Sequence, residues 1–374
     1  MITIHPPKRF LFGPGPTQVE PRVYEAMSQP VVGYLDPYFF EVADHVKKGL
    51  QTVFGTTNDL TLAISGTGSS GMETAVSNFV EPGSKLAVIV GGYFAERLCE
   101  MGRRHGANVV RLDKPWGEAA SDDEVRDFIL KERPSTVAYV HAETSTGVLQ
   151  KGKAICEAAH QVGALAIADC VTSLGGVKIG VDETGIDIAY SCTQKGLSCP
   201  PGLSPFTASP RAVERLMARK QPNTIWYLDL TMLNDYYGPA HKYHHTAPIS
   251  NFYALREGLA LISEEGVEAR WARHLSNHER LVTGMEELGL TMHVAKGERI
   301  PHLNTVRVPD GVDDLAVRKR LLSEHGIEIA GGFGPLAGKI FRIGLMGPLS
   351  TPATTQFFLD SFAKAVQGVS FHSR

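Results

Sequence analysis

Short apolar runs alternate with stretches of helical periodicity from residue 58 to about residue 210. The runs are rich in β-branched residues and almost wholly apolar, which is typical of strands buried on both faces. The predicted strands are 60–65, 85–90, 108–112, 136–141, 164–169, 186–191 and 203–208. The helices predicted between them are 69–80, 94–105, 121–132 and 152–162. This alternation predicts a mostly parallel sheet covered by helices on both faces.

The pattern changes after about residue 250. Helical periodicity predicts two long helices, 250–265 and 267–287, and a terminal helix, 352–366. Four short apolar segments are predicted to form strands of a mixed sheet: 290–295, 303–309, 327–332 and 339–344. We therefore predict an α/β fold in which a large domain is followed by a smaller C-terminal α+β domain. The expected divisions are an N-terminal segment 1–20, a large domain 21–255 and a small domain 256–374.

Composition and charge narrow the class of protein. The chain has 374 residues, 43% of them hydrophobic, and 37 Lys and Arg against 40 Asp and Glu, which is typical of a globular protein with a large core. It has no dense basic run, so we expect no nucleic-acid binding. No apolar run reaches the roughly 18 residues of a membrane span, and we expect no membrane contact. The first ten residues lack the apolar region of a signal peptide, so we expect none, and the five cysteines, an odd number without a CxxC motif, favour a reducing cytoplasmic location.

A glycine-rich segment, Gly66-Thr-Gly68-Ser-Ser-Gly71, follows a predicted strand directly and opens a predicted helix. It matches the pattern GxGxxG, in which the helix N-terminus binds phosphate. A nicotinamide site would also need an acidic residue at the end of the next strand, where the sequence has Val90-Gly-Gly-Tyr93. We therefore predict a phosphate site without a dinucleotide. A tight turn that binds nothing is the alternative.

Two charged residues follow predicted strands at the same edge of the sheet. Asp169 ends the strand 164–169, and Lys195 lies just beyond the strand 186–191. Alone, the first could cap the next segment and the second could be a solvated turn residue. Together with a phosphate site they suit pyridoxal 5'-phosphate, which needs a lysine amine for a Schiff base, an anion beside its ring nitrogen and a phosphate anchor. The lysine could also carry the proton during the reaction.

Eight motifs resemble, in order and spacing, those of the class V (fold type I) pyridoxal-phosphate aminotransferases. They are Phe12-Gly-Pro-Gly-Pro-Thr17, Ile64-Ser-Gly-Thr-Gly68, Glu143-Thr-Ser-Thr-Gly147, Asp169-Cys-Val-Thr-Ser-Leu-Gly175, Thr193-Gln-Lys195, Pro200-Pro-Gly202, Tyr243-His-His-Thr246 and Phe341-Arg-Ile-Gly344. The resemblance runs from about Phe10 to the end. It is greatest to the alanine–glyoxylate and serine–glyoxylate (serine–pyruvate) aminotransferases. It implies a ping-pong transfer of the amino group of alanine or serine to glyoxylate.

The resemblance also implies roles for single residues. Lys195 forms the Schiff base and Asp169 pairs with the pyridine nitrogen; both are catalytic. The other implied cofactor contacts are Thr67, Gly68, Ser69 and Gln194 at the phosphate, Thr144 near the phenolic oxygen, Val171 under the ring, Phe94 stacked on it, and Tyr243 and Thr246 reaching the phosphate from the partner subunit of a homodimer. The implied substrate contacts are Gly15, Thr144 and Arg342, whose guanidinium suits a carboxylate.

Two positions depart from the pattern of the family. Phe94 stands where the mammalian-type enzymes carry a tryptophan, which lowers the stacking area but keeps an aromatic face for the ring. Ser69 stands where the nearest relatives often have histidine.

Other functions remain as alternatives. Within the aminotransferases, the donor could be aspartate or ureidoglycine, and the acceptor could be pyruvate. A cysteine desulfurase or lyase is disfavoured, because every cysteine lies between residues 99 and 199 and Gln194 replaces the histidine that precedes the lysine in desulfurases. The missing strand-end acid disfavours an NAD-dependent dehydrogenase. His241, His244 and His245 lack a neighbouring carboxylate or cysteine, so we expect no metal site.

Overall fold

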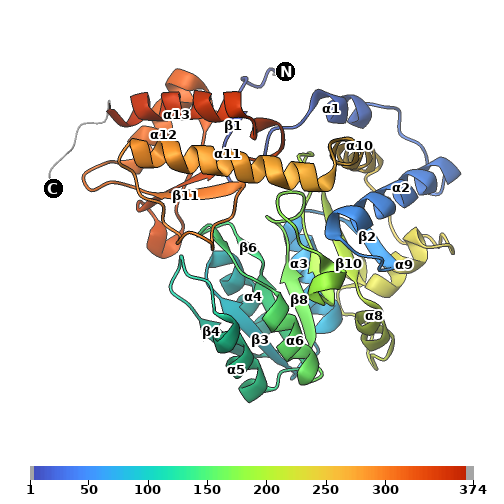
Figure 1. Cartoon of the computed structure of the whole chain (residues 1–374). Coiled ribbons are helices and arrows are strands. Elements are labelled where there is room, and N and C mark those ends of the chain that lie inside the picture. Colours follow the sequence, from blue (N-terminus) through green and yellow to red (C-terminus); the bar gives the residue numbers. More distant parts are fainter. Residues whose placement is uncertain (1–3, 368–374) are drawn as a thin grey trace.

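A seven-stranded sheet forms the centre of the protein, shown in a computed structural model that describes residues 4–367 (Figure 1). Its strand order is β2-β10-β9-β8-β5-β3-β4. The strands are β2 (Leu60–Ser65), β3 (Lys85–Val90), β4 (Asn108–Asp113), β5 (Thr136–Val140), β8 (Leu165–Asp169), β9 (Ile188–Tyr190) and β10 (Leu203–Ala208). Only β10 is antiparallel to its neighbours, β2 and β9. The predicted mostly parallel sheet is therefore confirmed.

Helices cover both faces of this sheet. Val137 and Tyr139 of β5 pack into a core with side chains of α2, α5, α6 and α10, whereas Ala138 and Val140 pack with α3, α4 and α8. This period of two is that of a strand buried on both faces. The helices are α2 (Pro37–Phe54), α3 (Gly68–Phe79), α4 (Tyr93–Arg104), α5 (Asp122–Glu132), α6 (Lys153–Gln161), α8 (Pro210–Met217) and α10 (Ile249–Glu265).

The C-terminal part forms a separate layer of helices and short strands, drawn in orange and red at the top of Figure 1. Its helices are α11 (Val267–Glu287), α12 (Asp314–His325) and α13 (Pro352–Gln367). Its sheet, ordered β11-β14-β13, consists of β11 (Leu303–Arg307), β14 (Ile340–Gly344) and β13 (Ala330–Gly331). Both strand pairs of this sheet are antiparallel, so the predicted mixed sheet is wrong.

The predicted strand 290–295 is also wrong. Its only ladder contact is an isolated bridge between Met292 and Val306. The chain turns away at Lys296 and Gly297, where Gly297 has φ +95°, before a ladder can lengthen. The apolar side chains Met292 and Val294 are nevertheless buried, which explains why the sequence pattern resembled a strand.

The N-terminal segment joins the C-terminal layer. Strand β1 (Phe10–Leu11) pairs in parallel with β12 (Ile327–Glu328), and Phe12 packs in the same core as Phe341 and Phe358. Helix α10 runs unbroken across the predicted division at residue 255 and contacts α1 (Pro21–Met27). The divisions 1–20, 21–255 and 256–374 remain predictions.

The remaining elements are short. They are the hairpin of β6 (Ala142–Glu143) and β7 (Val148–Leu149), α7 (Val181–Thr184), α9 (Leu230–Tyr237) and the 3-10 turns Trp226–Leu228, Gly334–Leu336 and Gly347–Leu349. Within residues 4–367, no helix is both long and apolar enough to span a bilayer. The same residues contain no group of three His, Cys, Asp or Glu side chains placed to hold a metal ion.

Candidate active site

Most of the predicted site residues, all except Tyr243 and Thr246, lie at the carboxyl edge of the large sheet. The segments that follow β2, β3, β5, β8 and β9 all leave the sheet at this edge, and β10 re-enters it there because it is antiparallel. Lys195 lies in the connection between β9 and β10, and Asp169 is the last residue of β8. This is the position at which open α/β sheets bind ligands.

Lys195 is a buried amine without an acidic partner. Its side chain is 7% exposed, and its Nζ donates to Thr144 Oγ1 at 2.8 Å and to Thr172 Oγ1 at 3.0 Å. Among residues 4–367 no carboxylate forms an ion pair with it. Burial lowers the pKa of Lys195 below its usual value. The lysine is therefore set up to present a neutral, nucleophilic amine.

Asp169 is held on two hydrogen-bond donors. Its Oδ1 accepts from the backbone N–H of Val171 at 2.9 Å, and its Oδ2 accepts from the hydroxyl of Tyr190 at 2.9 Å. Burial raises the pKa of Asp169, whereas these two bonds and the charge of Lys195 lower it. A cation placed against this carboxylate would further stabilise its ionised form.

The start of helix α3 offers unpaired backbone N–H groups. Thr67 is its N-cap residue, but the threonine side chain makes no capping hydrogen bond. The N–H of Ser70 donates to the carbonyl of Thr67 at 2.8 Å, whereas those of Gly68 and Ser69 have no backbone acceptor among residues 4–367 and suit an anion, which the helix dipole also favours. Arg97 Nη1 donates to Ser69 Oγ at 3.0 Å and adds a positive charge. Thr67 and Ser69 are exposed, as a phosphate contact requires.

Gly68 and Gln194 complete this corner of the site. A Cβ on Gly68 would lie 3.0 Å from Val171 Cγ2, so the close approach of the α3 N-terminus to Val171 depends on glycine. The side-chain Oε1 of Gln194 is buried without a hydrogen-bond partner among residues 4–367. A buried polar atom of this kind commonly marks a place where a ligand or water binds.

Helix α4 is fixed by a buried acid that the sequence interpretation did not assign. The carboxylate of Glu143 accepts hydrogen bonds from the backbone N–H groups of Phe94 (3.2 Å) and Ala95 (3.3 Å), and from the hydroxyl of Ser145 (2.6 Å). An anion at a helix N-terminus is stabilised by the dipole. The helix in turn places the ring of Phe94, whose centroid is 5.5 Å from Lys195 Nζ.

Arg342, on β14, brings a second buried cation to the site. Its side chain is 4% exposed; Nε donates to the carbonyl of Gly331 at 2.7 Å and Nη1 to that of Thr144 at 3.4 Å. Burial lowers the pKa of Arg342 to about 10, while the charge of Glu143 raises it. Within residues 4–367 its guanidinium has no carboxylate partner. Thr144 therefore links it to Lys195.

An exposed aromatic pair lies beside Arg342. The ring centroid of Phe333 is 4.1 Å from Arg342 Cζ and 5.2 Å from the ring centroid of Tyr93. Tyr93 packs edge-on against Phe94. Phe333 comes from the C-terminal layer and Tyr93 from α4, so the pair bridges the two layers next to the Arg342 guanidinium.

The N-terminal loop packs directly on the lysine. Gly15 has φ +116°, and a Cβ there would lie 2.9 Å from Lys195 Cγ. The backbone N–H of Thr17 donates to the carbonyl of Gln194 at 3.0 Å, and its hydroxyl donates to the carbonyl of Lys195 at 3.0 Å. The loop that contains Gly15 therefore contacts Lys195 at the carboxyl edge of the large sheet.

Tyr243 and Thr246 do not join the site of their own chain. Both are exposed, and the Tyr243 ring packs against Tyr34. Over residues 4–367 neither side chain hydrogen-bonds to another predicted site residue. Between them, His245 forms a hydrogen bond to Ser65 at 2.7 Å. The pair is therefore presented outward from a segment anchored next to the glycine-rich turn.

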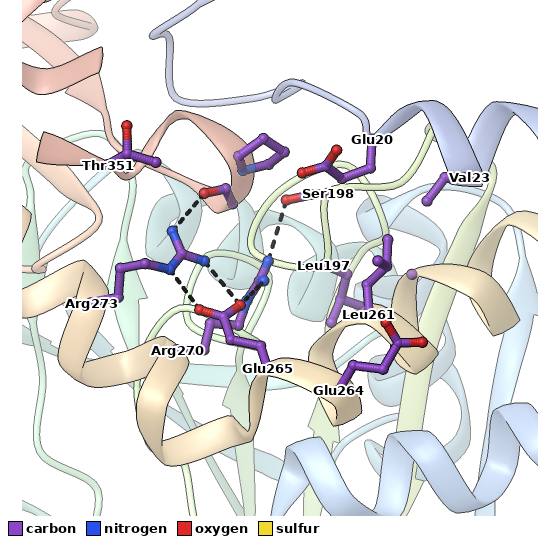
Figure 2. Close-up of a pocket in the computed structure, with 13 residues that line it drawn as sticks. Glu20, Val23, Leu197, Ser198, Leu261, Glu264, Glu265, Arg270, Arg273 and Thr351 are labelled. Carbon is purple, nitrogen blue, oxygen red and sulfur yellow. Dashed lines mark hydrogen bonds and ion pairs between the residues drawn. The ribbon is translucent and has the colours of Figure 1, made fainter. Parts of the chain in front are cut away.

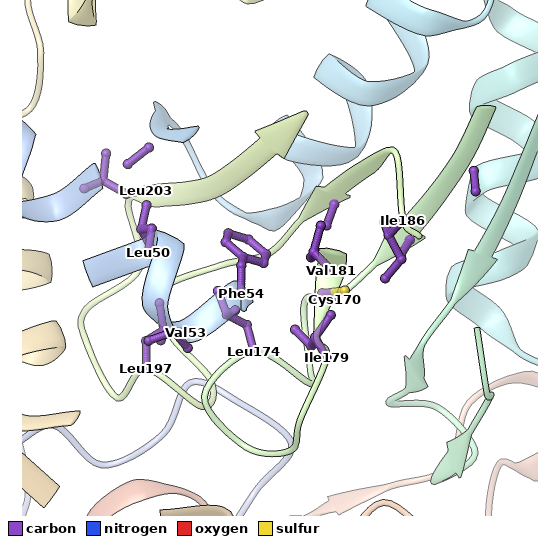
Figure 3. Packing of buried hydrophobic residues seen from close by; sticks show 14 of the residues in the cluster. Leu50, Val53, Phe54, Cys170, Leu174, Ile179, Val181, Ile186, Leu197 and Leu203 are labelled. Atoms are coloured by element: carbon purple, nitrogen blue, oxygen red, sulfur yellow. The ribbon is translucent and has the colours of Figure 1, made fainter. Parts of the chain in front are cut away.

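Apolar side chains anchor the two catalytic segments from below. Figure 3 shows Cys170 and Leu174, which follow Asp169, and Leu197, which follows Lys195, in a cluster with Val53 and Phe54 of α2. Such close packing restricts the backbone on either side of the reactive groups.

The sequence analysis assigned no role to several residues that contact the site, among them Thr172, Glu143, Tyr190 and Phe333. Thr172 and Glu143 belong to motifs quoted above, so their position was a usable signal. Tyr190 and Phe333 carried no signal, because their contacts with Asp169 and Arg342 depend on strand pairing and on a loop from another layer.

Comparison with known proteins gives a consistent result. A family model described as aminotransferase class-V matches residues 9–340. An alanine–glyoxylate aminotransferase of Drosophila melanogaster is 37% identical over 369 residues, covering 97% of this chain and 94% of the relative. The crystal structure of an alanine–glyoxylate aminotransferase from Nostoc sp. superposes with a TM-score of 0.96 at 47% identity, covering 98% and 97% of the two chains. That of a ureidoglycine–glyoxylate aminotransferase from Bacillus subtilis has a TM-score of 0.96 at 38% identity, covering 98% and 96%.

The chain belongs to the class V aminotransferases. It is an enzyme that depends on pyridoxal phosphate. The residues of the site fit this cofactor: Lys195 is a buried amine without an ion-pair partner among residues 4–367, Asp169 is a buried carboxylate held in place, and Gly68 opens a helix N-terminus suited to phosphate.

Proposed function

We propose that the enzyme transfers the amino group of alanine or serine to glyoxylate in a ping-pong reaction. The observation that carries this proposal is the buried guanidinium of Arg342, which has no acidic partner within residues 4–367. It donates to the carbonyl of Thr144, whose hydroxyl accepts from the Lys195 amine. An arginine in this state suits a substrate carboxylate, which it can bind through two parallel hydrogen bonds. The similarity to glyoxylate-using relatives supports the acceptor.

The mechanism follows from what each residue can do. Pyridoxal phosphate, when bound, supplies an electron sink for the negative charge that develops at the substrate α-carbon. Its phosphate would be held by Thr67, Gly68, Ser69 and Gln194, its ring by Phe94 and Val171, and its phenolic oxygen by Thr144. Arg342 binds the carboxylate and so fixes the α-carbon of the substrate.

Lys195 moves the proton. Because burial lowers the pKa of Lys195, its Nζ is neutral over a wider pH range and can take the α-proton of the donor. Thr144 and Thr172 hold the amine in one orientation. Asp169, whose carboxylate accepts from Val171 and Tyr190, would favour a proton on the cofactor's ring nitrogen.

The surroundings of Arg342 support a small donor. Phe333 lies against the guanidinium and Tyr93 lies against Phe333, which narrows the space beyond the carboxylate. Arg97 favours a second candidate, an acidic donor such as aspartate, because its guanidinium lies near Phe94 without an acidic partner among residues 4–367. Ureidoglycine as donor and pyruvate as acceptor complete the set to be tested.

Two further features belong to the proposal. We infer a homodimer in which Tyr243 and Thr246 reach the phosphate of the partner's site, supported by their exposure and by the exposed Trp226, whose ring stacks on His244 of the same segment. We also infer a cytoplasmic enzyme, supported by five cysteines that are all free.

Half-reactions test the donor and the acceptor separately. The purified holoenzyme is mixed with alanine, serine, aspartate or ureidoglycine, and loss of the visible cofactor band is followed. Glyoxylate, pyruvate or 2-oxoglutarate is then added and its return is timed. We expect alanine or serine to bleach the band fastest and glyoxylate to restore it fastest. Faster bleaching by aspartate would overturn the small-donor proposal, and no bleaching by any amino acid would overturn amino transfer.

A further inference from the structure

Arg270, in the first turn of α11, has a buried guanidinium that the mechanism above does not use. Its side chain is 5% exposed. Nε donates to the carbonyl of Gly175 at 3.1 Å, Nη2 to the carbonyl of Gly196 at 2.9 Å, and Nη1 to the carboxylate of Glu265 at 2.8 Å. All three edges of the planar group are therefore occupied, which is a geometry that only arginine provides.

The two carbonyls belong to the two segments that carry the catalytic residues. Gly196 follows Lys195 directly. Gly175 ends the segment that begins at Asp169 and includes Thr172, the second hydroxyl partner of the lysine amine. The two segments touch backbone to backbone, since a Cβ on Gly175 would lie 2.8 Å from the carbonyl oxygen of Gly196. One guanidinium thus bonds both the segment that follows Asp169 and the segment that follows Lys195.

A cavity of about 440 Å³ lies on the other side of Arg270. Figure 2 shows Arg270 and Arg273 on either side of Glu265, with Ser198 of the lysine loop above Arg270. Arg273 shares the acid at 2.6 Å, but its other bonds go to the carbonyls of Gly347 and Ser350. Arg270 is therefore the member of this pair that reaches the catalytic segments, and it lines the cavity together with Leu197 and Ser198 of the lysine loop.

We propose that Arg270 is a positioning residue that fixes Lys195 relative to Asp169 and Thr172 by holding both segments from the junction of α10 and α11. This rests on the amino-transfer function proposed above. Without the guanidinium, the lysine loop moves against its neighbour and water from the cavity enters the space that the guanidinium fills. Arg342 is on β14 and keeps its place. Proton transfer should therefore suffer, while binding of the substrate carboxylate should not.

Steady-state kinetics of three variants test the proposal. Arg270→Gln removes the guanidinium. Arg270→Lys keeps the charge, but its single ammonium cannot donate to both carbonyls. Arg273→Gln is the matched control, because it also loses a bond to Glu265. We expect kcat to fall about 10- to 100-fold in both Arg270 variants, the range that small misplacements produce. KM for the donor should stay within about 2-fold, since binding free energy is unchanged. The control should keep its kcat.

A second readout uses the apoprotein and needs neither cofactor nor substrate. Acetic anhydride labels neutral amines, and mass spectrometry follows the rate at Lys195 as a function of pH. Loss of Arg270 removes a nearby positive charge and lets water approach, so the labelling midpoint should move to higher pH in Arg270→Gln and stay in place in Arg273→Gln. An unchanged midpoint together with an unchanged kcat in either Arg270 variant would overturn the positioning role. If no donor bleaches the wild-type holoenzyme, only the proposed function fails, because the labelling result still judges Arg270.

Discussion

Three ionisable side chains, Lys195, Asp169 and Arg342, are buried almost completely by the fold, at 7%, 2% and 4% exposure. Burial of ionisable groups is costly, and proteins keep such groups mainly where chemistry needs them. None of the three has an oppositely charged side chain in ion-pair contact among residues 4–367. A bound cofactor and a bound carboxylate would supply the missing charges.

The pH dependence of stability gives a direct test of the buried lysine. Between the lowered pKa of Lys195 in the fold and its ordinary value of 10.5, the unfolded chain binds a proton that the folded chain does not. Stability of the wild-type apoprotein therefore rises with pH in that window. Lys195→Met lacks this cost and should be more stable, by about 1.4 kcal/mol for each unit by which the pKa is lowered.

The advantage of Lys195→Met should be largest at pH values below the lowered pKa and should shrink as the pH approaches 10.5. Thermal unfolding of the two apoproteins across this range measures it. Lys131→Met, on the exposed side of α5, controls for the loss of one positive charge. A difference between wild type and Lys195→Met that does not change with pH would refute the lowered pKa.

Arg342→Lys tests the carboxylate site. A lysine keeps the charge but loses the bidentate geometry, and a charged hydrogen bond contributes about 1.5–3 kcal/mol, so KM for alanine should rise about 10- to 100-fold. Steady-state kinetics with alanine and glyoxylate measure the change. Arg280→Lys, an exposed position on α11, should have the wild-type KM. An unaltered KM in Arg342→Lys would remove this residue from the substrate site.

At the scale of elements, the site depends on how α4 begins. Both oxygens of Glu143 accept hydrogen bonds, from Phe94, Ala95 and Ser145. Burial raises the pKa of Glu143, whereas the bonds from Ser145 and Ala95 lower it and favour the ionised form. The acid therefore acts as a buried cap that orients the helix bearing Phe94 and Arg97.

Glu143→Gln should lower both the stability of the protein and its kcat. The amide turns an N–H group toward backbone donors, which leaves at least one buried N–H unsatisfied and costs about 1–3 kcal/mol. The melting temperature and kcat should both fall, because Phe94 shifts. Glu124→Gln, in the exposed capping box of α5, should lose stability alone. A Glu143→Gln enzyme with wild-type melting and kcat would show that this cap is dispensable.

The sequence indicated most elements of the large sheet because their pattern is local. The apolar runs 60–65, 85–90 and 203–208 coincide with strands, since strands buried on both faces need no partner to be recognised. The segment 290–295 was misjudged because apolar burial without a neighbouring ladder looks the same in sequence. Likewise, Lys195 and Asp169 stood out at strand ends, whereas the contact of Tyr190 with Asp169 depends on the pairing of β8 with β9.

At the scale of the whole molecule, the outward-facing Tyr243 and Thr246 raise the question of a second subunit. The N-terminal and C-terminal segments close one end of the chain's own site through Gly15 and Arg342. The residues expected to bind the phosphate, by contrast, form no hydrogen bond with the side chains of Tyr243 or Thr246 of the same chain within residues 4–367. A homodimer with shared sites would use both residues.

Hybrid dimers test this arrangement. Lys195→Ala and Tyr243→Ala enzymes are each assayed alone at limiting cofactor, then unfolded together, refolded and assayed again. If Tyr243 acts on the partner's site, each hybrid dimer contains one site without either change, and an equal mixture should regain about a quarter of wild-type activity. Activity equal to the mean of the two parents would contradict a contribution in trans. Light scattering should give the mass of a dimer for both parents.

The identity of the lysine that holds the cofactor decides most directly whether this edge of the sheet is the active site. Sodium borohydride reduces the bond between pyridoxal phosphate and its lysine, and mass spectrometry of the digested protein then locates the added mass. We expect one modified residue, Lys195, no stable label in Lys195→Ala, and protection of the lysine when alanine is added first. A label on a different lysine, or equal labelling of Lys195→Ala, would contradict the assignment of the site.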